Sequence, residues 1–523
     1  MANTAPPVDQ KELFGHPVGL YILFFTEMWE RFSYYGMRAI LVLYLVSATT
    51  EGNAGLGWSQ AEALALYGWY TMLVYVVSIP GGILADKVFG QKKAVLIGGI
   101  ILVIGHGILA VEEMWAFYTG LGLIIAGVGL LKPNISTMVG GLYKEGDIRR
   151  DKGFTIFYIG INVGAFLSSI IVGTVGEVYG WHYGFGLAGI AMALGLLVYL
   201  WGQKYLTNVG NLLSKVERDE GASLGNLFGD LFKSPMQLVV SIILLGLSIW
   251  GWLELGFGYG LLFLFLTLVV AMMMMVYKDL TTQVMKDRYV VMLLSFILVI
   301  VFWGAFEQAG GLMNIYALDN TDRTIPFSLP FGIGNEIPAS WFQSLNAMFI
   351  IIFGVVIANY WAKRKLKSKE ASSIFKMAIG VIIMGLGFIF MVFAALQFES
   401  NGSSAMYWLV LAYLFHTIGE LCSSPVALSF ITKLAPVKYA SLMMGVYFAA
   451  TGLGNKVAGE LGAFASEAGD IAIFSGITIF TVVFASLVLL MLKPLKRLTH
   501  GAEDNERELM EQEQYELADS KVN

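Results

Sequence analysis

The sequence predicts an all-α integral membrane protein with about 14 transmembrane helices, and three observations lead to this prediction. Of the 523 residues, 57% are hydrophobic and only 14% are charged, whereas soluble proteins carry roughly 25% charged residues. Apolar runs of about 20 residues, the length that crosses a bilayer as a helix, recur along the whole chain. The loops between these runs alternate between rich and poor in basic residues.

The apolar runs are separated by turn residues and charges, and each run is expected to form one helix. The first run follows a polar segment that ends at Pro17, and it is too long for a cleavable signal peptide. We therefore expect it to remain as the first transmembrane helix. The predicted spans are 18–47, 60–84, 94–112, 115–141, 153–176, 183–203, 236–255, 257–277, 290–317, 340–361, 374–397, 405–433, 438–463 and 471–492.

Loop charge predicts the orientation of the chain in the cell membrane. The loops at 49–59, 318–339, 398–404 and 464–470, and those around Glu112 and Glu177, contain one basic residue, Arg323. By the positive-inside rule the basic loops and both termini are cytoplasmic, which requires an even number of spans. The basic loops hold Lys87, Lys92, Lys93, Lys144, Arg149, Arg150, Lys152, Lys363, Arg364, Lys365, Lys367 and Lys369.

The polar segment 204–235 divides the chain into six predicted spans before it and eight after it. If the pair 236–277 is an insertion, six spans remain on each side. Glu254 is the only charged residue in 242–277, so this pair is expected to be peripheral, without buried polar groups and facing lipid. The predicted domains are a six-helix bundle at 1–203, a linker with two extra helices at 204–285, a second bundle at 286–495, and an acidic cytoplasmic tail at 496–523.

The first predicted helix carries four charges in the stretch "TEMWERFSYYGMR". At 100° per residue, its charged residues and one tyrosine project from one face roughly 100° wide. Four charges facing lipid would cost about 10 kcal/mol, so this face must be turned away from lipid. Glu27 and Arg31, four residues apart, can neutralise each other, but Arg38 needs a partner on another helix or a ligand anion. The residues on this face are Glu27, Glu30, Arg31, Tyr34 and Arg38.

Isolated polar residues recur at membrane depth elsewhere in the chain. Lys132 directly precedes Pro133, Glu307 follows Trp303 by one turn, and Glu420 shares a helix face with Ser424. Ionisable groups spread over several spans favour a functional site over a purely structural ion-pair cluster. With the amides of Asn162 and Asn346, they predict a cavity between the two halves, positive on one wall and negative on the other.

Such a cavity suits a zwitterion. A free carboxylate would pair with Arg38 and Lys132, and a free ammonium would pair with Glu420, helped by the amides of Asn162 and Asn346. Glu307 could alternate between pairing with Arg38 and carrying a proton, which would couple proton movement to substrate binding.

Several other classes are disfavoured by the sequence. The single cysteine, Cys422, excludes an internal disulfide framework and a cysteine-rich metal site. No nucleotide-binding motif stands between a strand and a helix, and no H-E-x-x-H motif or Ser/His pair indicates an enzyme. We expect no enzymatic activity, no cofactor other than protons as coupling ions, and no nucleic-acid partner.

Four motifs resemble those of a known family. "GGILADKVFGQKK" at 81–93 resembles the loop signature of the major facilitator superfamily. The run from Glu27 to Gly36 is similar to the E-x-x-E-R-F-x-Y-Y-G motif of the proton-dependent oligopeptide transporter family, and "FYIGIN" at 157–162 and "GELCSSPV" at 419–426 resemble two more of its motifs. The resemblance extends from about residue 18 to 495. It implies two six-helix bundles of the major facilitator superfamily fold, with the two extra helices of many bacterial members between them.

The resemblance also implies a function: proton-coupled symport that imports di- and tripeptides by alternating access. Arg38 and Lys132 would then hold the peptide carboxylate, and Asn162, Asn346 and Glu420 the peptide amine. A carrier of another small anion, such as nitrate, is the alternative with the same fold. The resemblance assigns proton coupling to Glu27, Glu30, Arg31 and Glu307. It assigns the side-chain pockets to Tyr34, Tyr35, Tyr75 and Trp303. The candidate substrate-binding residues also include Ser424 and Tyr447, which stands where many members have tryptophan.

Overall fold

The computed structural model describes residues 11–50, 52–144, 147, 149–207, 209–212, 235–436 and 439–503, and most of them are helical. Every predicted span corresponds to a long helix. Among the described residues, 11 helical segments are long and apolar enough to cross a membrane. The other three predicted spans are α1 (Val18–Val46), α10 (Pro235–Leu255) and α17 (Ala440–Ala468). The chain is therefore an all-α integral membrane protein.

The first half of the chain runs from α1 to α7. Its second span is built from three consecutive helical pieces, and its fifth and sixth spans end in short π and 3-10 turns. The remaining elements are α2 (Gln60–Val76), α3 (Ser78–Leu84), η1 (Ala85–Phe89), α4 (Gln91–Leu109), α5 (Met114–Gly141), α6 (Arg149–Thr174), η2 (Val175–Tyr179), α7 (Trp181–Gly202) and η3 (Gln203–Tyr205).

The second half contains one interruption that the sequence did not reveal. The predicted span 290–317 is broken at Glu307, where α12 (Gln283–Phe306) ends in the 3-10 turn η4 (Glu307–Ala309) and α13 (Leu312–Asp319) begins. The other elements are α11 (Phe257–Asp279), η5 (Ala339–Gln343), α14 (Ser344–Leu366), α15 (Ser373–Asn401), α16 (Met406–Leu434), α18 (Asp470–Leu490) and α19 (Leu492–Leu498).

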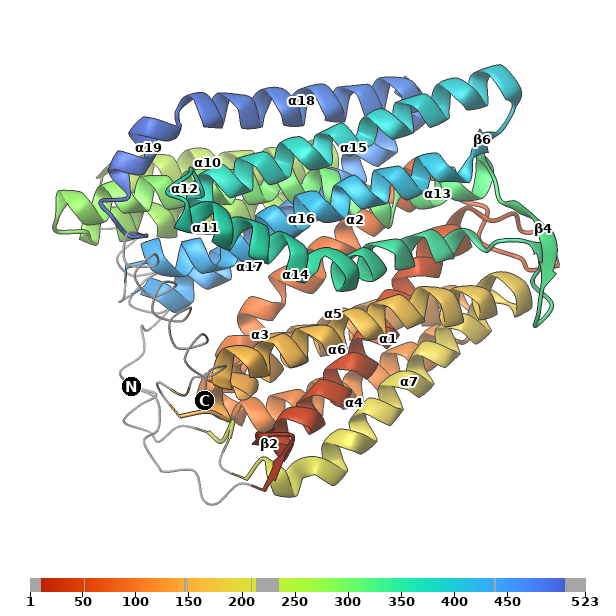
Figure 1. Cartoon of the computed structure of the whole chain (residues 1–523), viewed down its shortest axis with the longest axis horizontal. Helices are drawn as coiled ribbons and strands as arrows, with labels where there is room; N and C mark the ends of the chain where they lie inside the picture. Colours follow the sequence, from red (N-terminus) through yellow and green to blue (C-terminus); the bar gives the residue numbers. More distant parts are fainter. Residues whose placement is uncertain are drawn as a thin grey trace.

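Short strands lie outside the spans. The strands β1 (Glu12–Leu13) and β2 (His16–Pro17) pair before α1. At the other end of the helices, β3 (Thr321–Asp322) pairs in parallel with β6 (Ser404–Ala405), and β4 (Thr324–Leu329) pairs antiparallel with β5 (Gly334–Glu336). Figure 1 shows residues 11–17 and α19 at one end of the helices and β4 and β6 at the opposite end. An even number of spans accounts for this arrangement, while the cytoplasmic location of the termini stays a prediction.

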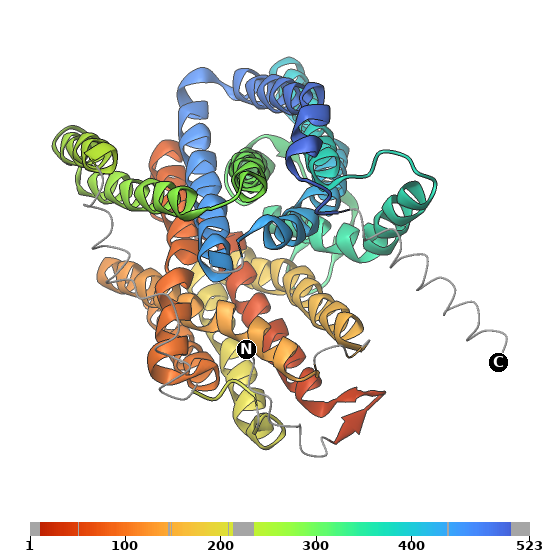
Figure 2. The same ribbon diagram turned by 90° about the vertical axis from the view of Figure 1, so that its left-hand side faces the viewer.

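The helices form two groups with an additional pair beside them. Helices α1–α7 lie together, and α12–α18 form the second group (Figure 1). Helices α10 and α11 form a hairpin outside both groups, next to α17 (Figure 2). The predicted domain boundaries stay a prediction, because much of the linker (208 and 213–234) and most of the tail (504–523) lie outside the described residues.

The expectation that the extra pair makes no buried polar contact is wrong. The Ser248 hydroxyl is buried and donates to the carbonyl oxygen of Gly260 at 2.6 Å. The hydroxyl of Tyr259 in α11 donates to a carboxylate oxygen of Glu460 in α17, also at 2.6 Å. The partner of Tyr259 comes from a helix 200 residues further along the chain, and nothing in the 236–277 segment itself points to it.

Glycines bring helix backbones into direct contact. A Cβ atom on Gly419 of α16 would lie 2.6 Å from the carbonyl oxygen of Gly380 in α15, and the reverse distance is also 2.6 Å. Between the two halves, a Cβ atom on Gly459 of α17 would lie 2.6 Å from the Cα atom of Gly68 in α2. Small residues at helix crossings permit this close approach in membranes, where van der Waals packing drives association.

A carboxylate joins the two halves near the end that carries β4 and β6. Glu177 in η2 accepts hydrogen bonds from the backbone N–H groups of Ala339 at 2.8 Å and Ser340 at 2.9 Å, and from the Ser340 hydroxyl. The indole N–H of Trp341 donates to the hydroxyl of Thr174 at 2.9 Å. Because the donors belong to η5 and the acceptors to α6 and η2, these bonds hold the two halves together at this end.

The glycine contact between α15 and α16 yields a stability prediction. In Gly419→Ala the new methyl group meets backbone, so the helices must separate, and we expect a cost of about 1–3 kcal/mol and a lower melting temperature in detergent. The matched control is Gly476→Ala in α18, where a Cβ atom would meet nothing within 4 Å. If both variants melt at the wild-type temperature, the close contact is not required.

Candidate functional site

The charged face of α1 is buried. Arg31 donates from Nε to Oε1 of Glu27 at 2.7 Å, and the same nitrogen lies 3.1 Å from a carboxylate oxygen of Glu30. The side chains of the two acids are each 1% exposed. Two carboxylates thus share one guanidinium, and the side-chain oxygens of Glu30 have no hydrogen-bond partner within the described part of the chain. This cluster holds one more negative than positive charge when both acids are ionised.

Arg38, two turns further along α1, has its partner in the other half of the molecule. Its guanidinium lies 3.0 Å from Oε1 of Glu307 in an ion pair that is largely buried. The Tyr67 hydroxyl of α2 donates to the same oxygen at 2.6 Å. Glu307 can face both groups because α12 ends there, and Gly310 leaves the necessary space, since a Cβ atom on it would clash with the Tyr67 hydroxyl.

Lys132 remains inside the first half. Its ammonium lies 3.7 Å from the centre of the Tyr75 ring, which is the geometry of a cation–π contact. Within the described residues, Lys132 forms no ion pair. A cation in a membrane span without a carboxylate partner is a candidate for binding a ligand anion.

Glu420 lies in α16 of the second half. The Asn346 amide donates to its Oε2 at 2.8 Å and to the Thr417 hydroxyl at 3.1 Å. Glu420 forms no ion pair with any described residue. The other predicted amide, Asn162, donates to the carbonyl oxygen of Tyr158 one turn earlier in α6, at 2.9 Å. The Asn162 side chain also forms a hydrogen bond with the Tyr158 side chain.

A cavity of about 110 Å³ lies between the two halves and is lined by both. Five of the predicted site residues line it: Tyr35, Arg38, Asn162, Asn346 and Glu420. Glu307 approaches it through Arg38. The other lining residues are Tyr158, Ile161, Ala165, Ser169, Phe306, Ala309, Gln343, Ala347, Ile350 and Tyr413.

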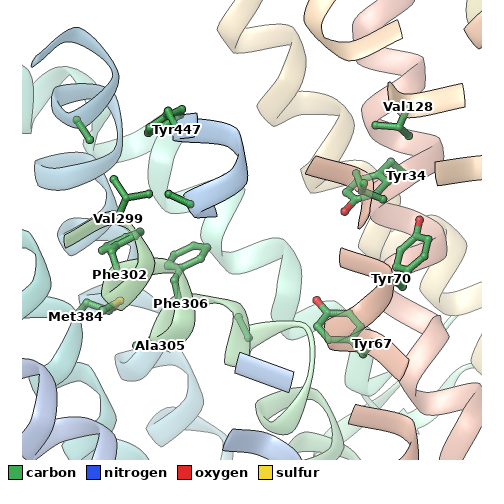
Figure 3. Packing of buried hydrophobic residues seen from close by; sticks show 14 of the residues in the cluster. Tyr34, Tyr67, Tyr70, Val128, Val299, Phe302, Ala305, Phe306, Met384 and Tyr447 are labelled. Carbon is green, nitrogen blue, oxygen red and sulfur yellow. The ribbon is translucent and has the colours of Figure 1, made fainter. Parts of the chain in front are cut away.

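The remaining predicted residues surround the cavity rather than line it. The rings of Tyr34 and Tyr35 are 5.3 Å apart, and Trp303 packs edge-on against Phe306, which does line the cavity. Figure 3 shows Tyr34 and Tyr67 on the first-half side and Phe306 and Tyr447 on the second-half side. Ser424 interacts with the side chain of Tyr447 in the second half. Glu27, Glu30, Arg31, Lys132 and Tyr75 lie in the first half, outside the lining.

Sequence reasoning missed five polar residues at the site: Tyr67, Tyr158, Ser169, Gln343 and Tyr413. Tyr67 binds Glu307, the Tyr413 hydroxyl donates to the carbonyl oxygen of Ala309 at 3.0 Å, and Gln343 donates to the carbonyl oxygen of Ala39 at 3.3 Å. Neutral hydroxyl and amide groups are common in apolar spans. The only available signal for Tyr67 was its four- and eight-residue spacing from Thr71 and Tyr75, which places all three near one face of α2.

Two helical halves around a buried, charged cavity define a membrane transporter. A profile of the POT family matches residues 92–475. The chain is 40% identical to the uncharacterized transporter YclF of Bacillus subtilis and 34% identical to the di-/tripeptide transporter of Lactococcus lactis subsp. cremoris, in each case over 94% of this chain. The alignments cover 97% and 98% of those two proteins, respectively.

The fold is also that of solved members of this family. The crystal structure of a POT family transporter in complex with a thioalcohol-conjugated peptide superposes with a TM-score of 0.78 at 34% identity, covering 93% of this chain and 99% of that one. The chain belongs to the POT family, whose members are transporters and not enzymes.

The Arg38–Glu307 pair yields a second prediction. Arg38→Leu leaves a buried carboxylate without its cation, which costs about 3–5 kcal/mol in other proteins, whereas the double variant Arg38→Leu/Glu307→Leu removes both charges. We therefore expect the single variant to melt at a lower temperature than the double variant. Additive losses, with the double variant the least stable, would mean that the two side chains are not coupled.

Proposed function

We propose that the chain is a proton-coupled symporter that imports di- and tripeptides by alternating access across the cell membrane. One observation carries the proposal: Lys132 in the first half and Glu420 in the second half are opposite charges without ion-pair partners in the described chain. A peptide with free termini supplies one carboxylate and one ammonium, which complement these two groups.

The termini of the peptide would be held on opposite walls. One nitrogen of the Arg38 guanidinium, Nη1, faces Glu307, and its buried Nε has no hydrogen-bond partner among the described residues. Arg38 can therefore bind a second carboxylate. Lys132 lies outside the cavity lining in this structure, so it would complete the basic wall of the first half in a conformation that exposes it. Glu420, with Asn346 and Asn162 beside it in the lining of the same cavity, provides the carboxylate that an ammonium would bind.

Proton coupling would depend on competition between Glu307 and the peptide carboxylate for Arg38. While Glu307 is ionised, it holds the guanidinium, and Tyr67 stabilises that ionised form with a hydrogen bond. Protonation of Glu307 would release Arg38 to the peptide carboxylate, since a neutral acid no longer compensates the cation. Glu27, Glu30 and Arg31 supply a second site, because their cluster neutralises fully only when one acid is protonated.

Names of related proteins support a peptide as the substrate. The Lactococcus relative is a di-/tripeptide transporter, and the solved relative contains a peptide conjugate. A carrier of a small anion such as nitrate would need the cations Arg38 and Lys132 but not an acid. The carboxylate of Glu420 lines the cavity and would repel a simple anion, which favours the zwitterion.

The first test is dipeptide uptake into proteoliposomes of the purified protein, with and without an inward proton gradient. Wild type should accumulate dipeptide only with the gradient. In Glu307→Gln the side chain cannot ionise, so gradient-driven uptake should fall at least tenfold while exchange of peptide across the membrane persists. Nitrate uptake in place of dipeptide uptake would overturn the peptide proposal.

The wall assignment is tested with blocked dipeptides. Glu420→Gln removes the carboxylate that would bind the ammonium, so the apparent affinity for free dipeptides should drop about tenfold or more. The affinity for N-acetylated dipeptides, already weak, should hardly change. Glu254→Gln, an exposed acid in α10, is the matched control and should behave as wild type. Equal losses for both peptide types would contradict this role of Glu420.

A further inference from the structure

A second charged cluster lies outside the central cavity. Lys456 in α17 has a side chain that is only 3% exposed, and it pairs with Glu460 one turn later. Its ammonium also lies 4.3 Å from the centre of the Trp69 ring and 5.0 Å from the centre of the Tyr259 ring. A buried ammonium at membrane depth is expensive unless it is compensated, and here one carboxylate and two aromatic rings compensate it.

These four residues come from three different parts of the chain. Trp69 belongs to α2 in the first half, Lys456 and Glu460 to α17 in the second half, and Tyr259 to the extra helix α11. Tyr259 contacts both halves: its hydroxyl donates to Glu460 at 2.6 Å, and its ring lies edge-on to Trp69 at 5.3 Å. Its neighbour Gly258 also packs closely on Trp69: a Cβ atom on Gly258 would lie 3.2 Å from the indole ring.

The cluster adjoins the closest contact between the two halves. Trp69 directly follows Gly68, whose backbone touches Gly459, and Lys456 precedes Gly459 by one turn. If α2 and α17 separate at this crossing, Lys456 loses the face of Trp69, and α11 loses one of its two partners. The compensation of this buried charge is therefore complete only while the crossing is closed.

We propose that the extra pair α10–α11 is a clamp: through Tyr259 it stabilises the conformation in which α2 and α17 are in contact at the end that carries β4 and β6. The clamp rests on the alternating access of the proposed function but not on a peptide substrate. Because the α10–α11 pair positions helices and contacts neither the cavity nor the substrate, it changes only the equilibrium between conformations.

The test measures that balance directly, by distances between spin labels at Thr50 and Glu467. Both positions are exposed and belong to opposite halves: Thr50 follows the end of α1, and Glu467 lies in the last turn of α17, three residues before Asp470, which binds Asn320 beside β3. The labels are placed in a Cys422→Ser background, since Cys422 is the only cysteine. Tyr259→Phe keeps the ring and removes only the hydroxyl, and Trp69→Leu removes the aromatic face. Tyr277→Phe, near the other end of α11, is the matched control.

Each clamp variant should raise the ratio of long to short label distances about fivefold or more, as expected for one lost hydrogen bond or cation–π contact, while Tyr277→Phe leaves it unchanged. Wild-type distance distributions in both Tyr259→Phe and Trp69→Leu, with wild-type folding, would overturn the clamp. Because the labels are read without substrate, this result is independent of uptake: failure of dipeptide uptake in wild type would remove the peptide proposal and leave the clamp standing.

Discussion

The need to compensate buried charge in a low-dielectric membrane determines how this molecule is organised. Arg38 cannot face lipid, and its carboxylate partner, Glu307, lies in the other half. The two halves are therefore joined at their centre by an ion pair, and the proposed function replaces its partners by a proton and a ligand anion. The break between α12 and α13 and the small Gly310 both serve this pair, since together they place the Glu307 carboxylate between Arg38 and Tyr67.

Much of this arrangement could be predicted from the sequence, because it depends on features that are local in the chain. Every span was found from hydrophobic run length, and the buried face of α1 from its 100° periodicity. The pairing of Arg38 with Glu307 could also be predicted, since charges in membrane spans are scarce. The break at Glu307 was missed, although Gly310 and Gly311 follow it, because apolar residues continue on both sides of this short segment. Tyr67 and the Lys456–Tyr259 contact were missed because hydrogen bonds between distant helices leave no periodic trace in either helix.

The contacts between the two halves fall into two kinds with different consequences. Polar contacts, such as those of Glu307 and Glu177, join groups that water, a proton or a substrate group can also bind. The backbone contact of Gly68 with Gly459 has no such substitute, because only van der Waals packing holds it. A transporter needs both kinds: the first lets conformations interconvert, and the second makes each conformation well defined.

The position of Gly68 along its helix has a mechanical consequence. The segment from Gln60 to Phe89 runs through α2, α3 and η1, with a turn at Val77 between the first two, and Gly68 lies near its first end. At 1.5 Å per residue, the arms on the two sides of the crossing are about 12 Å and about 30 Å long. The crossing therefore divides the segment unequally. While Gly68 and Gly459 are in contact, the short arm at the β4 end is held against α17, whereas the long arm contains the turn at Val77 and Pro80 and can bend without disturbing the crossing.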